Sequence, residues 1–172
     1  MREGNYFSLS QTIFITGLTV WMTIIVTNHF FDYDTVYHTI VRMFKMPKLI
    51  ADPNLGNGIE WRSGDWPKLA EMVFDGVILF QCVIVILLWR ATISHLKVNN
   101  TDAKDHTTAL KKINLALSLM IVMWFLFMCG GLFFGYWMEM GHVQDNHFNF
   151  LIMTLVGAAF MNVAPSRRST RK

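Results

Sequence analysis

The chain has 172 residues, of which 53% are hydrophobic and only 16% are charged, with a formal net charge of +3. A soluble domain normally carries about 25% charged residues, and here the charges are also gathered between long stretches that have almost none. This distribution excludes an ordinary soluble globular domain. We expect one all-α integral membrane domain over residues 1–172, in contact with the lipid bilayer and with no nucleic-acid partner.

Four apolar runs follow one another along the chain, and a helix needs roughly 20 such residues to cross the hydrocarbon core. They predict a four-helix transmembrane protein with spans at residues 11–31, 67–90, 113–138 and 147–164. The fourth run is the marginal one, and a buried core helix is the alternative there. No small-residue cleavage site follows the first run, so we expect a retained helix rather than a signal peptide.

Threonines lie along one face of the first predicted span, at spacings of three and four residues. Among them, Thr16 and Thr23 are expected to pack against another helix, because small polar side chains allow helices to approach closely in lipid. A polar conduit is the functional alternative. Packing is favoured because threonine hydroxyls commonly bond to the backbone of their own helix.

The segment after the first span begins "DTVYHTIVRMFKMPK", in which apolar and charged side chains fall on opposite helical faces. Asp34 is the expected N-cap and Pro47 the expected end of this helix. The pattern predicts a short amphipathic helix that lies at the membrane surface in the first outer loop.

Three polar residues lie in the second predicted span: Glu71, Asp75 and Gln81. An acid at the centre of a span costs roughly 2.5–3.5 kcal/mol on the insertion scale, and such a residue indicates function by default. The alternative is that Asp75 pairs with a polar group of a neighbouring helix, such as a threonine of the first span.

The third predicted span contains "GGLFFG", in which Gly131 and Gly135 form a pair of small residues four positions apart. This spacing predicts a close contact with another helix, either in the same chain or in a partner.

Histidines and carboxylates gather near the predicted outer face. A copper or zinc site needs three or four such ligands that converge at about 2.0–2.2 Å. No tight ligand motif is present, and polar residues also collect wherever a chain leaves the bilayer, so we expect no metal and no other cofactor. The candidate ligands for copper or zinc are His29, Asp32, Asp34, His38, His142 and His147.

Lysine and arginine set the expected orientation. Basic residues are frequent between the second and third spans and after the fourth, whereas "EMGHVQDNH", between the third and fourth, has none. The first outer loop also carries basic residues, but the bias predicts cytoplasmic N- and C-termini, and we expect a multi-pass protein of the bacterial inner membrane.

In chain order, "TNHFFDY", "VRMFKM" and "EWR" precede an acid-bearing second helix and "MWFLFMCGGLFFGYWMEMGHVQDNHFNF". This order and spacing resemble the bacterial family known as domain of unknown function 2165, a predicted small integral membrane protein. The resemblance runs from about Ile13 to Phe160; it implies four helices and no particular activity. The sequence departs from the family pattern near Gln81, where an acid is expected. The residues that carry the resemblance are Asn28, Asp32, Tyr33, Arg42, Met46, Trp61, Arg62, Gly130, Gly131 and Trp137.

The sequence contains no nucleophile triad, phosphate-binding loop or nucleotide-binding fingerprint. We therefore expect no enzymatic activity. We interpret the chain as a non-catalytic accessory or scaffolding subunit of a larger bacterial inner-membrane complex, of the respiratory or oxidase/monooxygenase type, which packs against other membrane subunits through its small-residue helix faces. The alternative is a metal- or small-ligand-binding membrane protein with its site at the periplasmic face.

Overall fold

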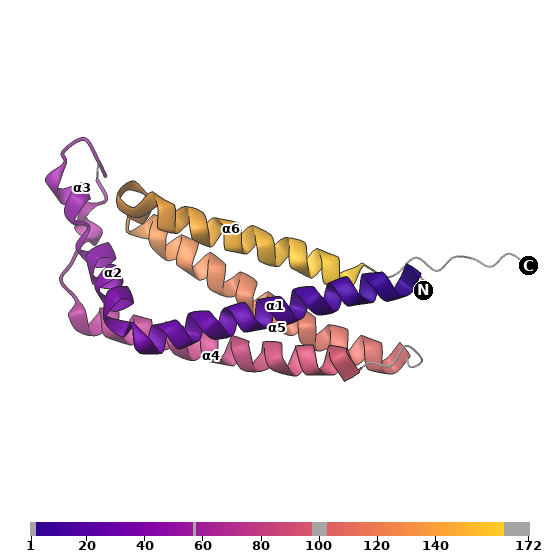
Figure 1. The fold of residues 1–172 in the computed structure, drawn as a ribbon. Helices are drawn as coiled ribbons and strands as arrows, with labels where there is room; N and C mark the ends of the chain where they lie inside the picture. The colour runs from indigo at the N-terminus through magenta and orange to yellow at the C-terminus, as the bar shows by residue number, and fades with distance from the viewer. Residues whose placement is uncertain (1–2, 57, 98–102, 164–172) are drawn as a thin grey trace, which may run out of the picture.

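The computed structural model describes residues 3–56, 58–97 and 103–163, and within these ranges every regular element is a helix. Residues 98–102 and 164–172 lie outside the described residues, and the second of these ranges holds the basic residues after the fourth predicted span that contribute to the predicted orientation. Four long helices lie side by side (Figure 1): α1 (Glu3–Phe31), α4 (Pro67–Lys97), α5 (Ala103–Phe133) and α6 (Tyr136–Asn162).

Short elements join α1 to α4 at one end of the bundle. They are α2 (Tyr33–Lys45), α3 (Pro47–Ala51) and the 3-10 helix η1 (Glu60–Arg62). The turn between α5 and α6 lies at the same end, which we call the capped end (Figure 1). The starts of α1 and α5 and the ends of α4 and α6 lie at the opposite end, which we call the open end.

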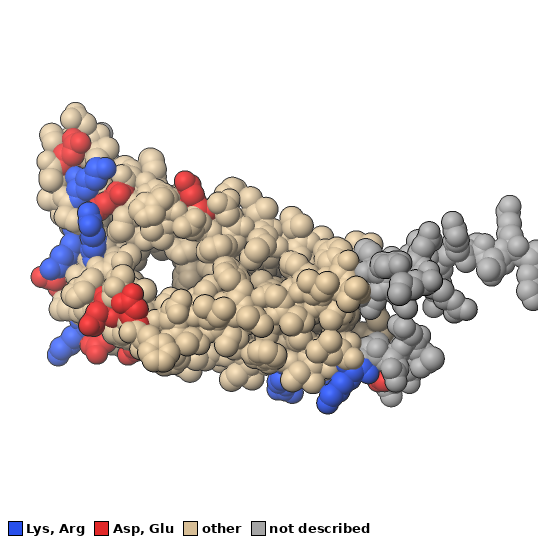
Figure 2. Space-filling view, in the orientation of Figure 1, with Lys and Arg blue, Asp and Glu red and all other residues tan. Residues whose placement is uncertain are grey.

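The lengths and composition of the helices fit a membrane. Among the described residues, Leu9–Phe31, Pro67–Lys97 and Asp105–Phe133 are long and apolar enough to cross a bilayer. The first half of α6 carries polar residues, so this helix is not in that set, although at 1.5 Å per residue it is about 40 Å long and packs along α5. Figure 2 shows charged side chains gathered mostly toward the ends, with an uncharged band between them. The all-α fold with long helices that could span a membrane is confirmed.

The amphipathic helix in the first loop is present as α2, with small differences at its ends. Its N-cap is Asp32, which makes no side-chain capping bond, so Asp34 lies within the first turn and is not the N-cap. The helix stops at Met46, which has a left-handed backbone (φ 47°), and Pro47 then begins α3. The expected helix end near Pro47 is therefore a break between two helices.

The core lies where α5 packs between α4 and α6, with α1 packed against α4. Lipid tails are as apolar as leucine, so the close fit of side chains contributes more to this packing than exclusion of water does. The largest buried side chains come from all four long helices and include Ile15, Met22, Ile84, Leu88, Leu117, Met120, Trp124, Leu151 and Met161.

The threonines of α1 bond first to their own helix. The hydroxyls of Thr19 and Thr23 each donate to the carbonyl four residues earlier, over 2.7 Å. Both also contact α4: the Thr19 and Thr92 hydroxyl oxygens are 2.8 Å apart, and the Trp89 indole donates to Thr23 over 3.1 Å. Thr16 is half-buried on the same helix. These contacts favour the packing interpretation over a conduit.

The turn between α5 and α6 corrects the expected third span. That helix ends at Phe133 rather than Met138, because Gly135 adopts a left-handed conformation (φ 60°) and starts α6. Gly135 is therefore a turn residue and not half of a helix-packing pair. Gly131 does lie at a helix contact: a Cβ there would meet the Oε1 atom of Gln144, on α6, at 2.3 Å.

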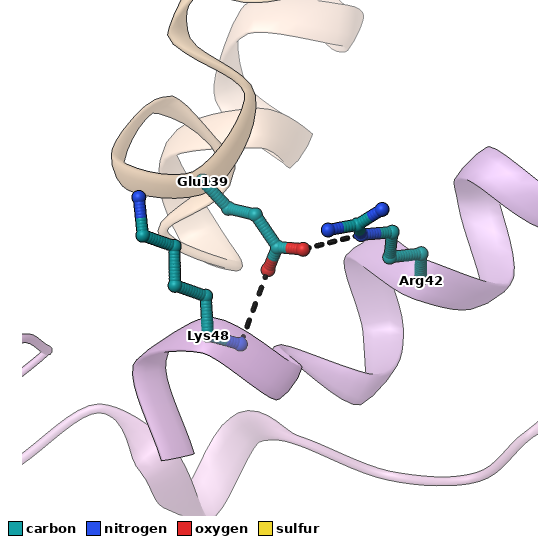
Figure 3. Close-up of polar contacts among 3 residues, drawn as sticks. All are labelled: Arg42, Lys48 and Glu139. Carbon is teal, nitrogen blue, oxygen red and sulfur yellow. Dashed lines mark hydrogen bonds and ion pairs between the residues drawn. The ribbon is translucent and has the colours of Figure 1, made fainter. Parts of the chain in front are cut away.

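A polar clasp fastens α2 and α3 to the start of α6 (Figure 3). The carboxylate of Glu139 accepts a hydrogen bond from Nε of Arg42, on α2, and one from the backbone N–H of Lys48, on α3, over 3.4 Å. The Glu139 side chain is only 4% exposed, whereas that of Arg42 is 60% exposed. Close by, Arg62 donates to the carbonyl of Phe133 over 2.8 Å. These bonds hold the loop elements against the α5–α6 turn.

Replacing Gly135 should destabilise the fold. A side chain in the left-handed region costs about 1–2 kcal/mol, and a Cβ there would lie 2.6 Å from Cδ2 of Leu49. We expect Gly135→Ala to lower the free energy of unfolding by at least that amount, measured by circular dichroism during titration with a denaturing detergent. Gly76→Ala is the control, because a Cβ there meets nothing within 4 Å, and it should keep or slightly raise stability. Equal stability of the two variants would contradict the turn assignment.

Removing the cation of the clasp should loosen α2. Arg42→Gln leaves the nearly buried Glu139 carboxylate without its ion-pair partner, at an expected cost of about 1.5–3 kcal/mol. Hydrogen–deuterium exchange of the α2 amides should speed up accordingly. The matched control is Lys45→Gln on the same helix, whose pair with Asp65 (3.0 Å) is exposed on both sides and is worth about 0–1 kcal/mol. Equal exchange rates of the α2 amides in the two variants would show that the clasp does not stabilise the position of α2.

Candidate functional site

A cavity of about 580 Å³ lies between the helices in the half of the bundle nearest the capped end. Figure 2 shows an opening between the helices near this end. Residues of α1, α2, α4, α5 and α6 all line the cavity. Pockets that hold small molecules usually measure about 300–1,000 Å³, so a molecule of moderate size fits here.

The cavity forms where the α1/α4 pair and the α5/α6 pair move apart. Near the open end the Phe14 and Phe160 rings are 5.9 Å apart, and farther along the Trp21 and Phe150 rings are 4.8 Å apart. Beyond that contact the cavity opens, and α2 crosses it as a roof, with Ile40 among its lining residues. The clasp at Glu139 therefore holds the roof in place.

The walls are apolar and rich in aromatic rings. Among the described residues that line the cavity, none is an aspartate, glutamate, lysine or arginine. Glycine contributes part of the α5 wall, and a Cβ added at Gly130 would meet no atom within 4 Å. The aromatic lining residues are Trp21, Phe74, Trp124, Phe127, Tyr136 and Phe150.

Two of the few polar groups in the wall bond to each other. His29, on α1, and Gln81, on α4, lie with Nδ1 and Oε1 2.7 Å apart. An amide oxygen only accepts, so with this placement of the amide Nδ1 donates, and the neutral ring keeps an acceptor at Nε2. Gln81 is only 2% exposed, and its amide nitrogen makes no hydrogen bond to any described residue. The pair therefore leaves a donor and an acceptor unused beside the cavity.

Tyr136 and His147 supply the polar groups of the α6 wall. Tyr136 is 6% exposed, and its hydroxyl has no hydrogen-bond partner among the described residues. The His147 ring stacks on Trp124, with centroids 6.0 Å apart, and its buried Nδ1 also lacks a partner among those residues. Buried polar groups are normally paired, so this wall has hydrogen-bonding capacity that the described chain does not use.

The two acidic residues of the second predicted span lie outside the cavity. Glu71 and Asp75 are exposed on α4, outside the cavity lining. Asp75 pairs with Tyr33 of the loop helix α2 (2.8 Å), and not with a threonine of α1 as the sequence suggested. This hydrogen bond raises the pKa of Tyr33 to about 12.

The candidate metal ligands do not converge. Asp32, Asp34, His38 and His142 are exposed, whereas His29 and His147 line the cavity. Within the described parts of the chain, no three side chains of histidine, cysteine, aspartate or glutamate come together.

The cavity and the residues that meet in it do not follow from the sequence pattern. The pattern predicts Gln81 only as an intramembrane polar residue, and Tyr136 falls inside the predicted third span. A usable signal was present: His29 and His147 each sit at the edge of an apolar span beside aromatic residues. Which faces these histidines share depends on helix packing, which their spacing does not give.

Comparison with known proteins places the chain in a family. No curated protein and no solved structure matches it. Residues 7–164 match the family described as "Predicted small integral membrane protein (DUF2165)". That match covers nearly the whole chain and agrees with the helical, apolar fold described above. The chain belongs to this family of small integral membrane proteins.

Proposed function

We propose that this protein binds a small uncharged molecule in the cavity beneath α2 and carries out no reaction on it. The observation that carries the proposal is the cavity, which has apolar walls and polar groups without partners among the described residues, including the buried Nδ1 of His147. That combination is typical of small-molecule binding sites. The small-ligand alternative from the sequence thus moves from the exposed loops to the interior of the bundle.

The chemistry of the wall supports binding rather than catalysis. The described lining residues include no cysteine, serine or carboxylate that could act as a nucleophile or a strong base. His29 is hydrogen-bonded to an amide, which carries no negative charge to stabilise an imidazolium as the carboxylate does in a Ser-His-Asp triad.

A second candidate function is that of an accessory subunit in a larger bacterial membrane complex. The observation that favours it is that Glu71 and Asp75 lie exposed on α4, a helix apolar enough to span the membrane, and that only Asp75 has a partner in the described chain, Tyr33. Acids within spans usually face protein or water rather than lipid, so a neighbouring subunit would suit this face. The two functions are compatible, since a subunit of a complex can also hold a ligand.

We further propose that the protein sits in the bacterial inner membrane with both termini in the cytoplasm. α4 ends and α5 begins at the open end (Figure 1), so Lys97, the last residue of α4, and Lys111 and Lys112, in the first third of α5, lie toward that end, which supports this orientation. The capped end, with α2 and the clasp, then faces the periplasm, and the cavity opens in the outer half of the membrane.

Filling the cavity should remove the ligand without harming the fold. Gly130→Leu places a side chain into open space at the cavity wall and also replaces a poor helix former. Mass spectrometry of small molecules that remain bound after purification should detect a near-stoichiometric uncharged compound with the wild type and not with Gly130→Leu. Gly76→Leu is the matched control, because Gly76 has open space but does not line the cavity. Recovery of the same compounds from all three proteins would refute binding in the cavity.

The orientation can be tested with single cysteines in a variant in which Cys82 and Cys129 are replaced by serine. We expect an impermeant thiol reagent to label Asn54→Cys, in the capped-end loop, in intact cells with a permeable outer membrane. Lys97→Cys, at the exposed end of α4, should react only after the inner membrane is disrupted. The reverse pattern would overturn the proposed orientation.

A further inference from the structure

We propose that the molecule bound in the cavity is a neutral lipid whose head is a planar ring with carbonyl groups, the chemistry of a quinone. This inference rests on the proposed binding function and names the class of ligand. Three features of the wall carry it: its lack of charge, its flat aromatic surfaces and the identity of its unused donors.

The absence of charged side chains in the cavity wall favours a ligand with a neutral head group. A phosphate or carboxylate taken into this cavity would have no cation among the described lining residues, and an unpaired buried charge is strongly unfavourable. Arg42, on the roof helix α2, is already paired with Glu139. Charged phospholipid heads therefore do not fit, whereas an uncharged head does.

The aromatic rings of the wall favour a ligand with a planar head group. Trp124 is only 2% exposed, and the rings of Phe150, Phe127 and His147, with centroids 5.2, 5.7 and 6.0 Å from its own, form with it an aromatic wall of the cavity. Trp21 faces the same cavity from α1. Aromatic faces favour offset stacking with another planar ring over contact with a flexible acyl chain.

The two unpaired hydrogen-bond donors in the wall favour a ligand that carries carbonyl oxygens as acceptors. The amide nitrogen of Gln81 and the hydroxyl of Tyr136 belong to side chains that are 98% and 94% buried, and both residues line the cavity from opposite helix pairs. Neither donor has a partner among the described residues. A ring with carbonyl groups on opposite edges can accept from both. The Nε2 acceptor of His29 is then available to a hydroxyl of the reduced ring.

The cavity tryptophans allow a direct test, because quinones quench indole fluorescence. The full chain in nanodiscs of zwitterionic lipid is titrated with a benzoquinone that carries a decyl chain. We expect saturable quenching, most of which disappears in a Trp21→Phe, Trp124→Phe variant. Native mass spectrometry counts bound molecules for the same quinone and for monodecanoylglycerol, a neutral amphiphile of the same chain length without a ring. The quinone should bind at one per chain and at least tenfold more tightly.

The outcomes separate the two proposals. Equal binding of quinone and monodecanoylglycerol would overturn the ring inference but leave the cavity as a binding site. Binding of neither compound would overturn both proposals. Quenching that is unchanged in the double tryptophan variant would place the quinone outside the cavity and overturn the inference.

Two variants test the donors. Tyr136→Phe and Gln81→Met should each weaken quinone binding about tenfold, which corresponds to the loss of one good hydrogen bond. The matched control is Gln144→Met, which removes a similarly buried amide that lies behind Gly131 and does not line the cavity; it should change the affinity less than twofold. If Gln81→Met fails to fold, Tyr136→Phe still decides the question. Unchanged affinity in Tyr136→Phe would overturn the assignment of the donors.

Discussion

The carboxylate of Glu139 ties together two halves of the bundle that otherwise diverge toward the capped end. α5 packs between α4 and α6, α1 packs against α4, and toward the capped end the Arg42–Glu139 bond joins α2 to α6. The attachment of α2 to α6 depends on the bond from Arg42 to the Glu139 carboxylate, which is nearly buried. This bond contributes more to stability than an exposed ion pair does, because the buried carboxylate has lost most of its contact with water and has few other hydrogen-bond donors. With the roof fastened, a space can persist below it instead of collapsing into closer helix packing.

The parts of the fold that hydropathy and local pattern determine could be predicted from the sequence. The three strongest apolar runs and the amphipathic face of α2 follow from composition and helical period. The turn at Gly135 was not predictable in this way, because "GGLFFGYWM" is apolar throughout and gives no sign of where the helix reverses. Only the left-handed backbone of Gly135, packed against Leu49 and Ile59, shows that the chain turns there.

The partners of the polar residues were harder to predict for the same reason. Thr19 and Thr23 satisfy their hydroxyls on their own helix, so local spacing was enough to interpret them. Asp75 and Gln81 find partners in other elements, Tyr33 and His29, more than 40 residues away in sequence. Such pairings depend on how the helices are rotated relative to one another. The helical period shows which residues share a face of one helix, but not which face of a neighbouring helix lies against it.

The distribution of polarity within the bundle bears on what the cavity can hold and how a ligand could reach it. Charged groups in the described chain are concentrated near the ends, while the cavity wall offers only neutral donors and acceptors. An ion approaching from water would lose its hydration without gaining a counter-ion, whereas a molecule already dissolved in lipid loses very little on entering. Beyond the Trp21–Phe150 contact α1 and α6 diverge toward the capped end (Figure 1), so a ligand dissolved in the bilayer would have the shortest route to the cavity from that side. Walls that disfavour ions would therefore favour a membrane-soluble ligand, and under the proposed function the unused donors on Gln81 and Tyr136 would distinguish such a ligand from the surrounding lipid.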